Sequence, residues 1–253
     1  MNLVFASGFL VPQHILGINY FNGLENRLKG KHETLFADVG PLDSCDKRAR
    51  VLADAIDRKF PKGAVHIFAH SMGGLDSRSL IGRNLNGLSD PGRIASLTTL
   101  SSPHRGSPVA DLLVGPKPFG LDLLIYESVR HALGQLSISI GALGDLTTEG
   151  ASQIPDAAKT HPDIRYRSCF AAGRPKLSPT CFILAPTHHY IHSVTDQAND
   201  GVVARDSARY GEFQEPFFQC DHIDLIGHNL DPPKFSNFQF DHFVKIEALI
   251  DQL

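Results

Sequence analysis

The sequence lacks the features that mark nucleic-acid-binding and membrane-spanning proteins. Lys and Arg number 24 against 27 for Asp and Glu, and the net charge of −3 leaves no basic excess to favour a nucleic-acid partner. No run of about eighteen apolar residues occurs, which argues against a transmembrane segment. With 253 residues and 42% hydrophobic side chains, the chain has enough material for one large globular domain with a buried core.

The sequence also gives no reason to expect a leader segment or a metal-binding cysteine pattern. Residues 3–5, which are apolar, follow Met1 almost directly, with no charged segment and no cleavage site before them. The sequence is therefore compatible with a cytoplasmic protein or with a secreted protein in its mature form. No Cys-x-x-Cys pair occurs, so a zinc ribbon is not expected. The chain has four cysteines, which are Cys45, Cys169, Cys181 and Cys220. They could form up to two disulfides, but we expect free thiols.

Short apolar or β-branched runs alternate with longer helical patterns along most of the chain. This alternation is typical of a parallel sheet whose strands are connected by helices. Strands are expected at residues 3–5, 34–37, 64–68 and 94–100, and helices at residues 18–28, 45–60, 73–81 and 238–253. Ser44 is the expected N-cap of the second helix, which ends before Pro61. The pattern predicts a single α/β domain over residues 1–253.

Residues 109–146 do not fit this alternation, because they carry more apolar side chains than one helical stripe needs. One explanation is a core helix that is buried on all sides. The other is a helical cap, or lid, over the active site, apolar on both faces because one face meets lipid. Hinges for such a lid could lie at the glycines and prolines of the segment: Gly115, Pro116, Pro118, Gly141 and Gly144.

Residues 65–74, with the sequence VHIFAHSMGG, hold the most informative pattern in the chain. An apolar strand leads into a tight turn around Ser71, and a helix begins directly after it. This pattern indicates the nucleophile elbow of serine hydrolases, usually written Gly-x-Ser-x-Gly, in which a strained turn lifts the serine hydroxyl clear of the sheet. The positions two before and two after the serine must be small, and here they are Ala69 and Gly73. An ordinary strand-to-helix turn is the alternative.

Acyl transfer also needs two N–H donors for the negatively charged oxygen of the tetrahedral intermediate. One donor is expected from the residue after the nucleophile, Met72. The glycine turn that follows residues 3–5 can direct the N–H of Phe9 at the same oxygen. The helix after the elbow adds the positive end of its dipole.

The acid and the base of such a site follow the serine in the order Asp or Glu, then His. Asp200 lies in an Asn-Asp-Gly turn, and His222 lies in a loop ahead of the last expected helix. The residues alone leave rivals open, which are Asp196 and Asp206 for the acid and His228 and His242 for the base.

Several short blocks of the chain resemble the true bacterial lipases of the Pseudomonas and Burkholderia type. They occur in family order at residues 5–24 (around ILGINYF), 65–74, 102–107, 146–157, 199–203 and 221–224. The resemblance implies an α/β-hydrolase fold with a mostly parallel central sheet, helices on both faces and a helical lid at about residues 109–146. It also implies triacylglycerol lipase or esterase activity.

The resemblance transfers five roles by position: Ser71 as nucleophile, Asp200 as acid, His222 as base, and the N–H groups of Phe9 and Met72 as the oxyanion hole. The chain departs from the family at Ser7, because members usually have a histidine before the oxyanion glycine. This departure changes the wall of the site, but we expect the backbone donor to remain.

A metal is not expected to be required. The lipases that the chain resembles often hold a structural calcium ion near the catalytic histidine, between two aspartates and backbone carbonyls. Asp224 matches one aspartate, but Ala185 stands in the region where the other should lie. One carboxylate fewer weakens a site for a hard cation, so calcium is expected to be absent or weakly bound. Residues 187–192 contain three histidines that could hold a transition metal, but no carboxylate or cysteine partner accompanies them.

The sequence as a whole predicts a lipolytic carboxylic-ester hydrolase, with triacylglycerol lipase ahead of short-chain esterase. Its expected partner is a lipid or another ester, which could be met at an oil–water interface. A hydrolase of polyesters or other bulky esters is the alternative within the enzyme class. A non-catalytic protein with a hydrolase fold is the alternative outside it, and the presence of all three triad residues argues against that reading.

Overall fold

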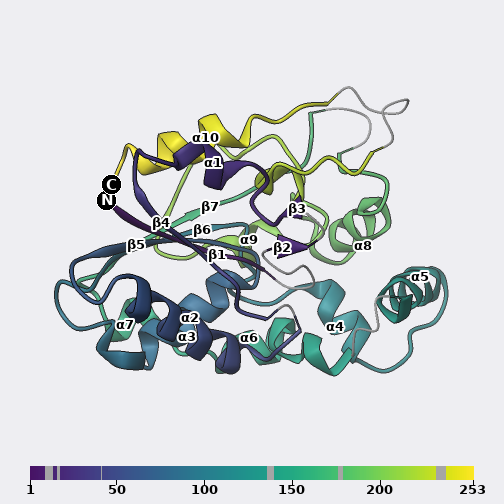
Figure 1. The fold of residues 1–253 in the computed structure, drawn as a ribbon. Helices are drawn as coiled ribbons and strands as arrows, with labels where there is room; N and C mark the ends of the chain where they lie inside the picture. The colour runs from purple at the N-terminus through teal and green to yellow at the C-terminus, as the bar shows by residue number, and fades with distance from the viewer. Residues whose placement is uncertain (9–13, 16–17, 41, 136–139, 176–178, 232–237) are drawn as a thin grey trace.

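A parallel sheet of six strands forms the centre of the molecule (Figure 1). The computed structural model describes residues 1–8, 14–15, 18–40, 42–135, 140–175, 179–231 and 238–253. The strands lie in the order β4 (Glu33–Ala37), β1 (Asn2–Ala6), β5 (Val65–His70), β6 (Ile94–Leu100), β7 (Arg165–Cys169) and β8 (Glu212–Phe213). Every neighbouring pair is parallel, so the carboxyl ends of all six strands meet at one edge.

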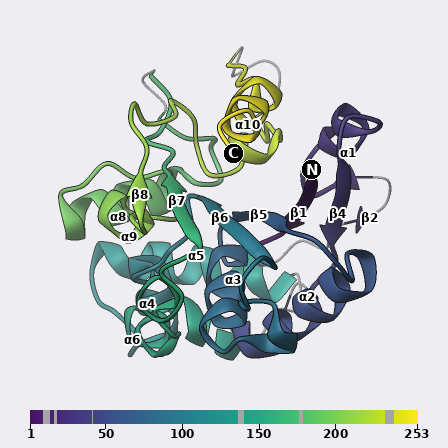
Figure 2. The same cartoon turned by 90° about the vertical axis from the view of Figure 1, so that its left-hand side faces the viewer.

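Helices cover both faces of this sheet (Figures 1 and 2). On one face lie α2 (Cys45–Lys59) and α3 (Gly73–Gly82), and on the other lie α1 (Leu24–Leu28) and α10 (His242–Ile250). Successive residues of a strand point to opposite faces. In β1, Val4 therefore packs in the cluster on the α2 side, whereas Leu3 and Phe5 pack in the cluster on the α1 and α10 side. A strand that is buried on both faces explains the unbroken apolar run at residues 3–5.

The predicted strands and most predicted helices are confirmed to within a few residues, but the helix expected at residues 18–28 is wrong over its first half. Residues Ile18–Asn19 form β3, which pairs antiparallel with β2 (His14–Ile15). Gly23 then adopts a left-handed backbone with φ of 69°, and α1 begins only at the next residue. The last helix begins at His242 rather than near residue 238, because the side chain of Asp241 caps it by accepting a hydrogen bond from the N–H of Val244.

The segment that departs from the alternation forms α4 (Pro108–Val114), α5 (Leu121–Gln135) and the 3₁₀ helix η2 (Ile140–Leu146). Helices α4 and α5 lie at the periphery beside α8 (Ala185–Thr195) (Figure 1), and η2 packs on α4. α5 packs Tyr126 inward together with Leu123 and Val129, whereas Leu124 is 66% exposed. A core helix buried on all sides is therefore the wrong explanation for this segment. It is a largely helical surface element.

The remaining helical elements are short: η1 (Leu85–Gly87), α6 (Thr148–Gln153), α7 (Ala157–Thr160), α9 (Arg205–Ala208) and η3 (Asp224–Ile226). All four cysteines are buried with free thiols, as expected from the sequence. Within the described ranges, no helix combines the length and the apolar character that a membrane crossing requires.

Candidate active site

Ser71 lies in the turn between β5 and α3, at the carboxyl edge of the sheet. Its backbone has φ of 55°, in the left-handed region that a residue with a side chain rarely adopts. Its N–H donates to the carbonyl of Leu100, the last residue of the neighbouring strand β6, at 3.1 Å. Strand, strained serine and helix follow one another as the elbow pattern predicts, and α3 begins two residues after Ser71.

The elbow turn needs a glycine at position 73, because α3 approaches the end of β1 very closely. A Cβ atom added at Gly73 would lie 2.5 Å from the carbonyl oxygen of Ala6 and 2.8 Å from that of Ser7. Both atoms belong to the backbone and cannot rotate away. Gly8 is similarly enclosed, since a Cβ there would lie 2.7 Å from the Cβ of Ser71.

We expect the substitution Gly73→Ala to lower the free energy of unfolding by about 1–3 kcal/mol, the usual cost of forcing an extra carbon into a packed region. It should also reduce ester turnover, because the added carbon pushes the end of β1 away from Ser71. Urea unfolding monitored by circular dichroism measures the first effect. Gly144→Ala is the matched control, since a Cβ at Gly144 meets nothing within 4 Å. Equal stability of the two variants would contradict the packing argument.

The structure brings Asp200 and His222 together. Nδ1 of His222 lies 2.7 Å from Oδ2 of Asp200, and both side chains are buried. The other carboxylate oxygen, Oδ1, accepts hydrogen bonds from the N–H groups of Val202 at 2.9 Å and Val203 at 2.7 Å. The backbone N–H of His222 donates to the Asp200 carbonyl at 3.1 Å. Side chain and backbone bonds together hold one ring nitrogen of His222 against the carboxylate.

His70 connects this pair to the elbow. The rings of His70 and His222 have centroids 4.4 Å apart, and His70 directly precedes Ser71. The imidazole of His222 therefore lies beside the elbow. Nδ1 of His70 lies 2.7 Å from the hydroxyl of Tyr20, which fixes the ring of His70 from the other side. Burial lowers the pKa of His70 well below its usual value, and the neighbouring His222 lowers that pKa further. A neutral His70 places no fixed positive charge against the His222 ring.

The buried neutral histidines predict a loss of stability in acid. Burial also lowers the pKa of His104 well below 6.5, and the charges of Arg78 and Arg105 add to the effect. His70 and His104 therefore bind a proton readily only after unfolding. At these two positions, below an unfolded-state pKa of 6.5, the unfolded chain binds more protons than the folded one, so the contribution of the two histidines to the free energy of unfolding falls as the pH falls.

Each such histidine should contribute a slope of about 1.4 kcal/mol per pH unit below its unfolded pKa. Urea titrations at a series of pH values on either side of this pKa measure the slope. His104→Gln should reduce the slope by the contribution of one histidine. His189→Gln, at an exposed histidine, should leave the slope unchanged. The same slope in His104→Gln as in the wild type would contradict the prediction.

A buried ion pair, which was not predicted from the sequence, anchors the backbone of residues 7 and 8 near the elbow. Arg48 on α2 and Asp76 on α3 are fully buried, with Nη2 of the arginine 2.8 Å from Oδ2 of the aspartate. The same Nη2 donates to the carbonyl oxygens of Ser7 at 2.7 Å and Gly8 at 3.1 Å. Arg48 thereby holds the backbone that leads toward Phe9. The available signal was a charge on the otherwise apolar stripe of α2, since a buried charge needs a partner.

Of the two expected oxyanion donors, one lies within the described residues. Met72 follows Ser71 at the start of α3, and in the described part of the chain its N–H donates to no protein acceptor. It is therefore available to an oxygen above Ser71. Phe9, the other expected donor, lies outside the described residues.

The rival bases bind backbone carbonyls elsewhere, and the rival acids lie at exposed positions. Nε2 of His228 lies 3.0 Å from the carbonyl oxygen of Asn19, and Nε2 of His242 lies 2.8 Å from that of Asn22. Asp206 is exposed and pairs with Arg205 at 3.3 Å, and Asp196 is an exposed residue at the end of α8. The histidines of residues 187–192 lie on α8, and over the described ranges no group of three or more His, Cys, Asp or Glu is placed to hold a metal ion.

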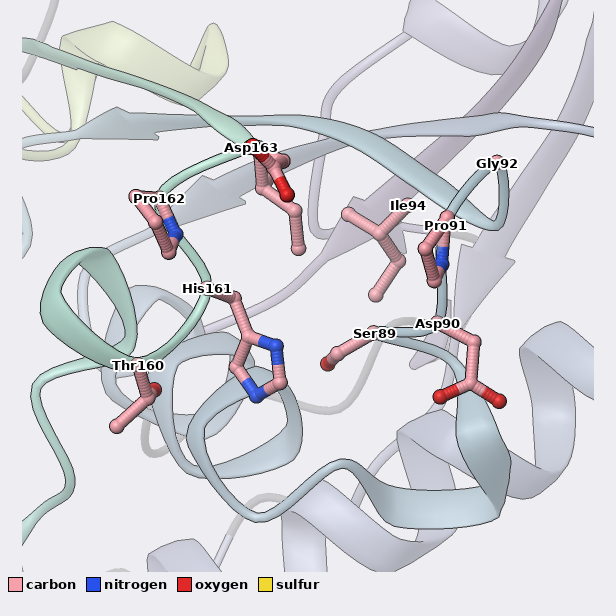
Figure 3. A pocket seen from close by; sticks show the side chains of 10 residues that line it. Ser89, Asp90, Pro91, Gly92, Ile94, Thr160, His161, Pro162 and Asp163 are labelled. Atoms are coloured by element: carbon pink, nitrogen blue, oxygen red, sulfur yellow. The ribbon is translucent and has the colours of Figure 1, made fainter.

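A cavity of about 300 Å³ on another part of the surface also contains a serine, a histidine and an aspartate (Figure 3). Its wall includes Ser89, His161 and Asp163 together with Ile94, the first residue of β6, so it lies at the opposite edge of the sheet from Ser71. The Ser89 hydroxyl donates to the carbonyl of Ile81 at 2.8 Å. Among the described residues, no hydrogen bond joins His161 to either of the other two. This cavity is therefore not a second triad.

Comparison with known proteins finds lipases among the relatives in sequence and among the neighbours in fold. The chain is 28% identical over 221 residues to triacylglycerol lipase 2 of Saccharomyces cerevisiae, covering 84% of this chain and 64% of the yeast protein. It is 25% identical over 259 residues to a triacylglycerol lipase of Vibrio cholerae, covering 88% and 78% of the two chains. The structure of lipase 1 from Pelosinus fermentans superposes with a TM-score of 0.67 at 20% identity, covering 100% and 98%. The chain has the α/β-hydrolase fold.

No family model matches the chain. The chain spans just under two thirds of the length of the yeast relative, and the sequence similarity reaches triacylglycerol lipases rather than the Pseudomonas and Burkholderia type in particular. The α/β-hydrolase fold predicted from the sequence is confirmed. The site roles of Ser71, Asp200 and His222 remain predictions that the geometry supports.

Proposed function

We propose that the chain is a lipolytic carboxylic-ester hydrolase, with Ser71 as nucleophile, His222 as base and Asp200 as acid. The observation that carries the proposal is the 2.7 Å hydrogen bond between Asp200 and His222, whose ring contacts the residue directly before the strained serine. A carboxylate that binds Nδ1 leaves Nε2 as the nitrogen that exchanges a proton with the serine hydroxyl. This pairing, next to the residue that precedes the serine, supports the proposal of acyl transfer.

The proposed reaction has two steps. His222 takes the hydroxyl proton of Ser71 while the serine oxygen attacks the ester carbonyl carbon, and the N–H of Met72 stabilises the resulting negative oxygen. Collapse of the tetrahedral intermediate breaks the bond to the alcohol, which leaves with the proton from His222. Water then attacks the acyl-enzyme by the same path and releases the carboxylic acid, which restores Ser71.

Lipid esters are the proposed substrates. Large apolar side chains are exposed around α5 and α8, with Phe119 at 91%, Leu124 at 66% and Phe182 at 58%. Exposed apolar surface of this kind suits contact with lipid better than with water. The similarity to proteins named triacylglycerol lipase supports the same substrate class. We further propose that the chain is of the Pseudomonas and Burkholderia lipase type and that residues 109–146 act as its lid.

The test combines covalent labelling with a substrate series. A fluorophosphonate probe should label Ser71, and peptide mass spectrometry would locate the labelled residue. Turnover of p-nitrophenyl esters of increasing chain length is then compared with turnover of emulsified triacylglycerol, and the rate should rise when an oil–water interface forms. Absence of labelling would favour a non-catalytic hydrolase-fold protein. Labelling with turnover of short esters alone would retain the ester hydrolase and overturn the lipase.

A further inference from the structure

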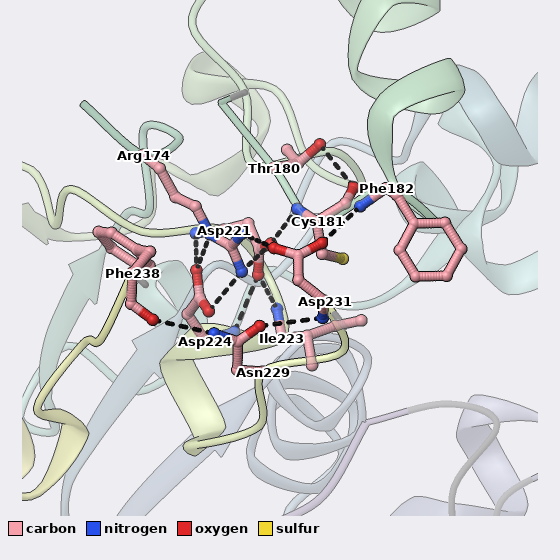
Figure 4. A network of polar contacts seen from close by, with 10 residues as sticks. All are labelled: Arg174, Thr180, Cys181, Phe182, Asp221, Ile223, Asp224, Asn229, Asp231 and Phe238. Carbon is pink, nitrogen blue, oxygen red and sulfur yellow. Dashed lines mark hydrogen bonds and ion pairs between the residues drawn. The ribbon is translucent and has the colours of Figure 1, made fainter. Parts of the chain in front are cut away.

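Next to the proposed base, one buried guanidinium contacts three carboxylates (Figure 4). Arg174 donates through Nε to Oδ2 of Asp224 at 2.7 Å and through Nη2 to Oδ1 of the same residue at 2.8 Å. Nη2 also lies 3.1 Å from Oδ2 of Asp221, and Nη1 donates to Asp231. Arg174, Asp221 and Asp224 are all buried, so each charge depends on the others for compensation.

Two of these carboxylates flank His222 in the chain and shape its turn. Oδ1 of Asp221 accepts hydrogen bonds from the N–H groups of Ile223 and Asp224, both at 2.9 Å. The N–H of Asp221 in turn donates to Oδ2 of Asp224 at 2.9 Å. Hydrogen bonds to its own two aspartates thus close the turn that presents His222. Both carboxylates also contact Arg174.

The same cluster reaches the segment ahead of α8. Oδ2 of Asp221 accepts from the N–H of Cys181 at 2.7 Å, and Oδ1 of Asp231 accepts from the N–H of Phe182 at 3.0 Å. Burial alone would lower the pKa of Arg174, but its hydrogen bonds to the carboxylates outweigh burial and raise that pKa. The guanidinium therefore stays charged and joins the His222 turn to two other parts of the chain.

These residues do not fit the calcium ion that the family resemblance implies. Both oxygens of Asp224, the residue that matches a family ligand, already accept from Arg174. Ala185 supplies no second carboxylate. Calcium needs about six to eight oxygen ligands. Here the carboxylate oxygens at the expected place are occupied by a cation that belongs to the protein.

We propose that Arg174 is a positioning residue, whose guanidinium supplies the positive charge that holds the His222 turn in place of a bound metal ion. The inference rests on the proposed function, because it concerns His222 as the base. Arg174 touches no reacting atom and acts only through Asp221 and Asp224. Its loss leaves three neighbouring carboxylates, two of them buried, to repel one another, which opens the turn and moves the imidazole.

The test compares Arg174→Met with Arg167→Met. Arg167 is also a buried arginine, but its partners lie in the last residues of the chain, with Nη1 3.2 Å from Oε1 of Gln252. Both variants lose a buried guanidinium, and both should lose stability. Only Arg174→Met should lower kcat, by roughly tenfold to a hundredfold, because a small displacement of a catalytic group has effects of this size. KM should change little, and each assay is run well below the variant's melting temperature.

Two further measurements do not depend on turnover. The proton shared by His222 and Asp200 should give a downfield imidazole resonance in the proton NMR spectrum of the wild type and of Arg167→Met. That resonance should shift or broaden in Arg174→Met. In the wild type, a chelator and added calcium should leave the melting temperature and kcat unchanged.

The outcomes separate this inference from the proposed function. If wild-type protein shows no ester turnover and no fluorophosphonate labelling, the proposed function fails, while the NMR comparison still tests Arg174. If Arg174→Met keeps the wild-type kcat and resonance, or if both variants lose kcat equally, Arg174 has no positioning role. A wild type that chelation destabilises would overturn the claim that the guanidinium replaces a metal ion.

Discussion

Ester hydrolysis by Ser71→Ala is expected to fall by about five to six orders of magnitude in kcat, the size of effect seen when a serine hydrolase loses its nucleophile. Removal of the hydroxyl eliminates the covalent intermediate, so labelling by a fluorophosphonate should disappear with the activity. The measurement is p-nitrophenyl ester turnover, with Ser89→Ala as the control. Ser89 lies in the cavity at the opposite edge of the sheet and should be dispensable for turnover. Substantial activity in Ser71→Ala would remove this residue from the mechanism.

The backbone at Ser71 adds a second readout to the same experiment. With φ of 55°, the residue occupies a region that costs on the order of 1 kcal/mol for a side chain and almost nothing for glycine. Ser71→Gly should therefore be as inactive as Ser71→Ala, yet more stable than the wild type by about that amount. If the turn holds Ser71 in a strained backbone conformation for the sake of function, relieving that strain should stabilise the protein. If Ser71→Gly were less stable than Ser71→Ala, the turn would not be strained.

The elbow could be predicted from the sequence because its signals are local. An apolar strand, a serine between small residues and a helix start lie within residues 65–74, and the close approach of Gly73 to Ala6 explains the demand for glycine. The pairing of Asp200 with His222 is different, since several aspartates and histidines fit the order along the chain. The family resemblance, not spacing, singled out these two.

The buried arginines that support the site could not be predicted from the sequence, because their roles depend on contacts between distant segments. Arg48 meets Asp76 and the carbonyl of Ser7, and Arg174 meets Asp221 and Asp224, all across long stretches of chain. A lone arginine in a sequence is usually a surface residue, so nothing but its place on an apolar stripe hinted at the burial of Arg48. The same limit explains the error at residues 18–28, where a left-handed glycine and a strand pair override helical composition.

Asp200→Asn should lower kcat by about four orders of magnitude while the fold is kept, as the corresponding change does in other serine hydrolases. The structure gives the reason. Oδ1 of Asp200 accepts from the N–H groups of Val202 and Val203, so in the variant only the amide oxygen can take that place. The amide NH₂ then faces Nδ1 of His222, where Oδ2 now accepts.

An amide that donates to Nδ1 forces the proton of a neutral imidazole onto Nε2, the nitrogen that must accept the proton of Ser71. The base is therefore lost although no side chain has moved, and KM should remain close to its wild-type value. Asp206→Asn, at an exposed rival aspartate that pairs with Arg205, is the matched control and should keep full turnover. Equal kcat for the two variants would show that Asp200 does not set the tautomer, and the chemistry proposed for His222 would then need another orienting group.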